Sequence, residues 1–523
     1  MSKCCRKCLP KYGRKKKLKT PRIFWSVIAI GIFSAVRITF FSFVPIWDGI
    51  SVSNCVLNSL IPKLEILRLN CHHPSIGYLG LVALGQMLDL GSARLIHVVN
   101  LLLAIFGLIC FAKIVQFLFK NGNQSSIFYL ETALVVLLLA FNPLFFAGTL
   151  SPNLDFGTAV FFLLSVYGLM YRRPIFSVVC LTLLIFTKET ALLFYIPLVV
   201  GYVFLFKREI FRMNEKAMIQ LRQLLEIGWY FVPLGLFLVY FEMQKLLHLT
   251  SGLWSNQATV RFILSRLWLR RIIVRCIQLG LLNFHWIYSL IIISYFARFL
   301  HFSRIKRILE SVKKIGQFDR QKRWWIILGA CGVVFAGPVL LVNTYTLPRY
   351  VIPLIPLLIL CCVYCLRRLI ISTRLRLFIL TGILFLSFFQ TFTSSDPVSN
   401  IIFTTFDFGE RKMLRMVSLV HECCGYAGKD QLAYNSEFTV IDSLINQLYR
   451  EIPKNGSIPL FIGEQDAAIN FLPFDVQTGK RTLRKTGIQF PSVFLVGDSQ
   501  YFPVCEIPDS AYFVYLPWSD TDA

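Results

Sequence analysis

The chain has 523 residues, of which 56% are hydrophobic and only 16% are charged, and its formal net charge is +26. A soluble domain carries about a quarter charged residues, so this composition excludes an ordinary soluble protein. The basic residues form short clusters between long apolar runs, which is typical of cytoplasmic loops and argues against a nucleic-acid-binding surface.

Residues 1–22 form a basic arm, which we expect in the cytoplasm. Apolar runs of about 18 residues or more can cross a hydrocarbon core about 30 Å thick, and they predict about eleven transmembrane helices within residues 23–392. In chain order we expect them at 23–44, 93–119 and 127–146, a fourth from about 155 to 171, a fifth ending at 188, and then 191–207, 227–240, 277–296, 324–342, 351–366 and 375–392.

Two regions are expected outside the membrane. Residues 45–92 predict an extracytoplasmic loop, and its Cys55 and Cys71 are candidates for a disulfide in an oxidising compartment. An odd number of spans from a cytoplasmic N-terminus places residues 393–523 on the same side. Their composition predicts a small α/β domain with a helix over 437–450 and short strands over 458–461, 493–496 and 511–515.

The fold class predicted is therefore an all-α polytopic membrane protein with a small extracytoplasmic α/β C-terminal domain. One outer segment, residues 261–275, is basic against the charge rule, and it predicts an interfacial amphipathic helix.

Polar side chains gather at the outer ends of the predicted spans. Ionisable residues near membrane depth are costly and usually functional. Each has a structural interpretation too: a helix-terminal acid, an exposed turn, a hairpin or a snorkelling arginine. The candidates are Asp48, His72, His73, Asp155, Lys188, Glu189, Arg349 and Tyr350.

Six short motifs follow one another along the chain. They are Trp47-Asp48, His73-Pro74-Ser75 with Gly77-Tyr78-Leu79, Ser92-Ala-Arg-Leu95, Asn142-Pro143-Leu144, Phe186-Thr-Lys-Glu-Thr-Ala191 and Pro348-Arg-Tyr-Val-Ile-Pro353. Their order resembles the GT-C glycosyltransferases, in the branch that includes protein O-mannosyltransferases and the lipid A aminoarabinose transferase. The resemblance is best over residues 45–205 and returns at 345–360.

This resemblance implies a polyprenyl-phosphate-linked sugar as donor, an active site on the extracytoplasmic face, and a lipid, glycan or protein acceptor. The family's first-loop and second-loop acids would be Asp48 and Asp155, as catalytic residues. Many members have a glutamate after the first acid, where this chain has Gly49.

The other candidates receive binding roles. We expect the donor phosphate to meet Lys188, Arg349 and Tyr350. We expect His72, His73 and Glu189 to position the acceptor or the donor. We expect no cofactor, because no P-loop or G-x-G-x-x-G stands in the chain, and a metal requirement stays open.

Two other functions compete with glycosyl transfer. A secondary transporter or lipid flippase would explain the spans, but we find no inverted repeat or matching pair of broken spans. An inactive relative that serves as a scaffold is the second, and Gly49 is the feature that favours it. The motif set is closest to bacterial members, which favours the bacterial inner membrane; in a eukaryote the expected site is the endoplasmic reticulum membrane.

Overall fold

The structure is a computed structural model of the chain. It describes residues 24–41, 48–60, 73, 75–88, 93–120, 126–206, 217–246, 276, 279–280, 284–298, 319–341, 348–392 and 398, and the strand residues 406–408, 411–413, 460–463, 493–496 and 512–514. The predicted basic arm, the helix over 437–450 and the amphipathic segment over 261–275 lie outside these residues.

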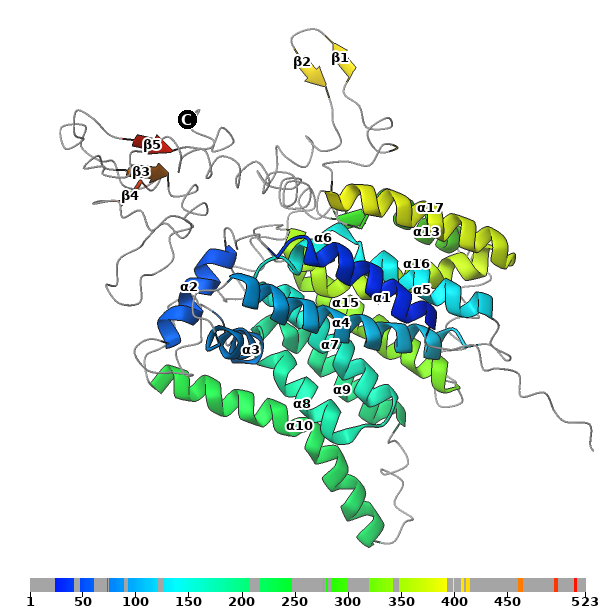
Figure 1. Cartoon of the computed structure of the whole chain (residues 1–523). Coiled ribbons are helices and arrows are strands. Elements are labelled where there is room, and N and C mark those ends of the chain that lie inside the picture. Colours follow the sequence, from blue (N-terminus) through cyan, green and yellow to red (C-terminus); the bar gives the residue numbers. More distant parts are fainter. Residues whose placement is uncertain are drawn as a thin grey trace, which may run out of the picture.

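Helices make up most of the described chain (Figure 1). The α-helices are α1 (Phe24–Ile38), α2 (Asp48–Leu60), α3 (Ile76–Gln86), α4 (Ala93–Leu118), α5 (Ser126–Ala140), α6 (Pro143–Gly148), α7 (Leu154–Met170), α8 (Pro174–Ile185), α9 (Leu192–Phe206), α10 (Ala217–Leu246), α13 (Trp286–Ala297), α15 (Arg320–Leu341), α16 (Ile355–Leu369) and α17 (Thr373–Phe392). Two 3-10 helices are η2 (Glu189–Ala191) and η7 (Pro348–Leu354).

Six helical stretches of the described chain are long and apolar enough to cross a membrane. They are Arg94–Leu118, Glu189–Phe206, Ile227–Gln244, Arg320–Leu340, Arg349–Leu369 and Thr373–Phe392. The other predicted spans overlap the shorter apolar helices α1, α5, α7, α8 and α13. The chain is thus a multi-pass integral membrane protein, and the number eleven stays a prediction.

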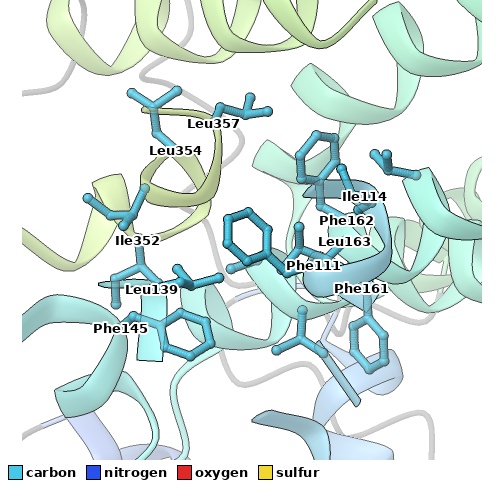
Figure 2. Close-up of a cluster of buried hydrophobic side chains, with 14 of the residues drawn as sticks. Phe111, Ile114, Leu139, Phe145, Phe161, Phe162, Leu163, Ile352, Leu354 and Leu357 are labelled. Carbon is cyan, nitrogen blue, oxygen red and sulfur yellow. The ribbon is translucent and has the colours of Figure 1, made fainter. Parts of the chain in front are cut away.

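The centre of the bundle is α7, which packs against α3, α4, α8, α9 and η7. Figure 2 shows part of this core, which includes Phe161, Phe162 and Leu163 of α7, Phe111 of α4 and Ile352 of η7. In lipid, helix association depends on close packing and polar contacts, because lipid tails are as apolar as leucine. A core of interlocking aromatic and branched side chains on α7 meets that requirement.

Basic side chains tie several helix ends together at one end of the bundle. Arg367 of α16 donates to Glu131 of α5 at 2.8 and 2.9 Å, and Arg376 of α17 donates to the same carboxylate at 3.3 Å. Arg323 donates to the carbonyl of Leu205 at 2.7 Å. These contacts join segments that the charge pattern predicts to be cytoplasmic, so we take this end as the cytoplasmic one.

Residues 45–92 are more structured than a loop prediction suggests. They contain α2 and α3, and α3 packs against α4, α7 and α8 with Tyr78 and Leu79 fully buried. The reason is that α3 is apolar throughout, so it belongs in the bundle. Cys55 of α2 is disulfide-bonded, while the predicted partner Cys71 lies outside the described residues.

Five short strands are described beyond the last helix. Strand β1 (Phe406–Phe408) pairs antiparallel with β2 (Arg411–Met413). Strand β3 (Leu460–Gly463) lies between β4 (Val493–Val496) and β5 (Tyr512–Val514), parallel to both. Strand β4 coincides with a predicted strand, β5 lies within another, and β3 overlaps the strand predicted over 458–461, whereas the predicted C-terminal domain as a whole stays a prediction.

Candidate functional site

The candidate residues lie at the end of the bundle opposite the arginine cluster, which is formed by Arg367 and Arg376 with Glu131. Helix α7 has Asp155 in its first turn, and its last residue, Met170, accepts a hydrogen bond from Arg320. Likewise Arg349 lies at the start of the η7–α16 segment, which ends near Arg367. The helices therefore hold the two groups at opposite ends of the bundle.

A buried ion pair forms the centre of the site. The ammonium Nζ of Lys188 lies 2.8 Å from Oδ1 of Asp155, and the two side chains are 7% and 6% exposed. Asn153 caps α7 by accepting from the backbone of Asp155 and Phe156, which fixes the carboxylate at the helix start. Lys188 is extended between α8 and η2, so its side chain can reach across to α7.

This pair determines the charge of the lysine. Burial lowers the pKa of the Lys188 ammonium, but the neighbouring Asp155 carboxylate outweighs it, and the pKa lies above its ordinary value. The lysine is therefore a fixed cation. Because the Asp155 carboxylate neutralises the Lys188 ammonium, the buried pair carries no net charge.

A second pair lies beside the first. Nδ1 of His73 is 2.8 and 2.9 Å from the two oxygens of Glu189, which follows Lys188 directly. The side chains of His73 and Glu189 are 33% and 19% exposed, so this pair is more accessible than the buried one. The two acids and two bases thus form neighbouring pairs of different exposure.

Backbone contacts hold the two halves of this second pair together. The amide of Gly77 donates to the carbonyl of Phe186 at 2.7 Å, which joins the start of α3 to the end of α8. A Cβ on Gly77 would lie 2.5 Å from the carbonyl oxygen of Leu183, so only glycine permits this approach. The side chain of Ser75 donates to the carbonyl of His73 at 2.9 Å.

The 3-10 helix η7 adds an aromatic ring and a second cation. The Tyr350 ring centre lies 4.6 Å from Nζ of Lys188 and 5.3 Å from the guanidinium carbon of Arg349. Both distances are in the cation–π range. Two cations from segments about 160 residues apart therefore meet on one ring.

A buried polar layer that the sequence did not predict lies behind the site. Arg37 of α1 is fully buried and donates to the side chain and the carbonyl of Thr149 at 2.8 and 2.6 Å. It also lies 2.7 Å from Nδ1 of His97. An arginine inside a predicted span was the available signal, because ionisable residues at membrane depth are rarely incidental.

The same layer continues toward α7. The hydroxyl of Tyr78 donates to Asn100 at 2.7 Å and accepts from the amide of Asn153 at 3.2 Å. Asn100 donates to the carbonyls of Thr149 and Ser151 at 3.1 and 2.9 Å. These bonds fix the loop before α7 and hence the position of Asp155.

Six of the eight candidates lie in these contacts: His73, Asp155, Lys188, Glu189, Arg349 and Tyr350. Asp48 begins α2, and its side chain lies outside the described residues, as does His72. The catalytic and binding roles themselves stay predictions. Within the described part of the chain, no cluster of three or more His, Cys, Asp or Glu residues is placed to hold a metal ion.

Comparison with known proteins gives one structural likeness. No family model matches the chain, and no curated protein matches it in sequence. Among solved structures, ArnT from Cupriavidus metallidurans bound to undecaprenyl phosphate is similar, with 13% sequence identity, 86% of this chain and 84% of that chain covered, and a TM-score of 0.46.

Proposed function

We propose that the chain is a membrane glycosyltransferase, which moves a sugar from a polyprenyl-phosphate donor to a lipid, glycan or protein acceptor on the extracytoplasmic face. The observation that supports this proposal is that Lys188 and Arg349 both contact the ring of Tyr350, at the outer end of the apolar bundle. A lipid phosphate needs cations at that depth and an apolar surface for its tail.

The two cations would share the phosphate unequally. Lys188 is almost fully buried in its pair with Asp155. Arg349, the other cation in contact with the Tyr350 ring, is only half-buried. We therefore assign the direct contact with the phosphate oxygens to Arg349, whose planar fork suits them. Lys188 supports it with a fixed positive charge, and Asp155 holds that lysine in place.

These charges suit the bond that breaks. When the sugar leaves, the lipid phosphate gains a negative charge, and preorganised cations favour that state over the bound donor. The acceptor must approach the sugar from the other side, where Asp48, as the family's first-loop acid, would help to position it. Membrane lipids would surround the donor tail; the compartment proposed is the bacterial inner membrane or, in a eukaryote, the endoplasmic reticulum membrane.

The test is turnover with a defined donor. We would incubate the purified protein in detergent with a panel of radiolabelled polyprenyl-phosphate sugars and measure sugar release or transfer. Wild type should turn over at least one donor, and Asp48→Ala and Arg349→Ala should each lower the rate by about 100-fold or more. Arg349→Lys should recover little, because an ammonium lacks the fork.

Two results would contradict the proposal. Donor binding without release or transfer would favour the transporter or flippase, and it could be followed by movement of a fluorescent lipid-phosphate sugar across vesicles. No response to any donor would favour the inactive relative.

A further inference from the structure

The pair formed by His73 and Glu189 has the geometry of a proton-accepting dyad. A carboxylate can only accept hydrogen bonds, so the ring nitrogen that lies 2.8 and 2.9 Å from the Glu189 oxygens must carry the proton. In the neutral ring the lone pair then sits on Nε2. The acid thereby fixes both the tautomer and the direction of the imidazole.

The other side chains of the site are less able to accept a proton. Oδ1 of Asp155 is engaged by Lys188 in a pair that is nearly inaccessible. Both oxygens of Glu189 face the Nδ1 hydrogen of His73. Lys188 is itself protonated, because the pKa of its ammonium lies above its ordinary value. Among the four paired side chains of the site, that of His73 is the most exposed, at 33%, and its Nε2 lone pair is not used by the contact with Glu189.

From this arrangement we infer that His73 is the catalytic residue that takes the proton from the acceptor, and that Glu189 is its positioning residue. The inference rests on the proposed function. The acceptor oxygen bonds to the anomeric carbon, the bond from that carbon to the phosphate oxygen breaks, and its electron pair leaves with the lipid phosphate. The acceptor proton passes to Nε2 of His73 and later to water.

Charge favours this step. The imidazolium that forms is stabilised by the Glu189 carboxylate at Nδ1. The lipid phosphate gains its negative charge on the side of Lys188 and Arg349. Each charge that appears during transfer thus has an opposite charge already in place, which is the condition for electrostatic catalysis.

A backbone hydrogen bond holds together the two segments that carry the dyad. The bond from Gly77 to Phe186 joins the segment of His73 to that of Glu189 three residues before the acid. The segments packed around the dyad carry further charged and titratable groups, which include Asp48 on α2, Tyr78 on α3, Arg94 and His97 on α4, Asp155 on α7, Lys188 beside η2, Glu242 on α10, and Arg349 and Tyr350 on η7.

The test uses whichever polyprenyl-phosphate sugar wild type turns over, with sugar release followed from about pH 5 to 9. Because the step needs a neutral imidazole, the wild-type kcat should rise with pH. His73→Gln should lower kcat by about 100-fold or more and remove that rise, while the KM for the donor changes little. Added imidazole should restore part of the rate of His73→Ala.

Glu189→Gln separates positioning from mere structure. The amide oxygen still accepts from Nδ1, but it no longer stabilises the imidazolium, so the midpoint of the kcat profile should move to lower pH. A purely structural role would lower kcat equally at every pH. Glu189→Asp should keep the wild-type midpoint.

The outcomes are distinguishable. If wild type turns over a donor and His73→Gln keeps both the rate and the pH dependence, the dyad inference is wrong and the proposed function stands. If His73→Gln is impaired but the profile of Glu189→Gln keeps its midpoint, the positioning role is wrong. If wild type turns over no donor, the proposed function and the inference fail together.

Discussion

The ammonium of Lys188 lies 2.8 Å from the carboxylate of Asp155, 33 residues earlier in the chain, and neither side chain is open to solvent. The pair links the end of α8 to the start of α7. It also places a cation against Tyr350, 4.6 Å from the ring centre. One contact therefore serves both the packing of the bundle and the charge of the site.

Removing one partner of this pair should be more harmful than removing both charges. Lys188→Met or Asp155→Asn alone leaves an uncompensated buried charge and should lower the free energy of unfolding by about 3–5 kcal/mol. The double variant should recover much of that stability, yet remain inactive because the cation is gone. Thermal unfolding in detergent together with sugar release measures both effects. Additive losses in the double variant would contradict the coupling.

Two glycines on α3 give a matched comparison. A Cβ on Gly77 would meet the Leu183 carbonyl oxygen at 2.5 Å, whereas nothing lies within 4 Å of a Cβ on Gly80. Gly77→Ala should therefore cost about 1–3 kcal/mol and separate His73 from Glu189, with loss of activity. Gly80→Ala should be neutral in both respects. Equal melting temperatures for the two variants would show that the close approach of α3 and α8 is wrong.

The buried arginine of α1 should not tolerate lysine. Arg37 donates from Nε and Nη2 to Thr149 at the same time, and a single ammonium cannot reproduce that fork. We expect Arg37→Lys to lower the free energy of unfolding by about 1–3 kcal/mol. Thr149→Val, which removes only the hydroxyl contact, is the control with a smaller expected loss. A fully stable Arg37→Lys would argue against the observed contacts.

The arginine cluster should affect the stability of the protein without affecting its catalysis. Glu131 is 3% exposed and forms ion pairs with both Arg367 and Arg376. Glu131→Gln leaves the arginines short of a countercharge and should cost about 3–5 kcal/mol. The kcat of the fraction that remains folded should be unchanged, because the site lies at the other end of α7. A lower kcat at constant folded fraction would require coupling between the two ends.

Hydropathy and charge clusters in the sequence determine much of this protein. A membrane span can be predicted from the local sequence, because each helix must satisfy its own backbone hydrogen bonds and present apolar side chains to lipid. Apart from α3, the apolar helices accordingly overlap the predicted spans, and the candidates Asp155, Lys188 and Tyr350 were identified at span ends. The strands β3, β4 and β5 were also predictable, since short apolar runs between turns are a local signal.

Partners, by contrast, depend on tertiary structure. The sequence shows Lys188 and Glu189 as neighbours. Only the packing of α3 and α7 against α8 pairs Lys188 with Asp155 and Glu189 with His73. The burial of α3 and the role of Arg37 were missed for the same reason. A contact between residues far apart in the chain leaves no periodic pattern, so the helix arrangement decides which charges meet and which of them stays accessible.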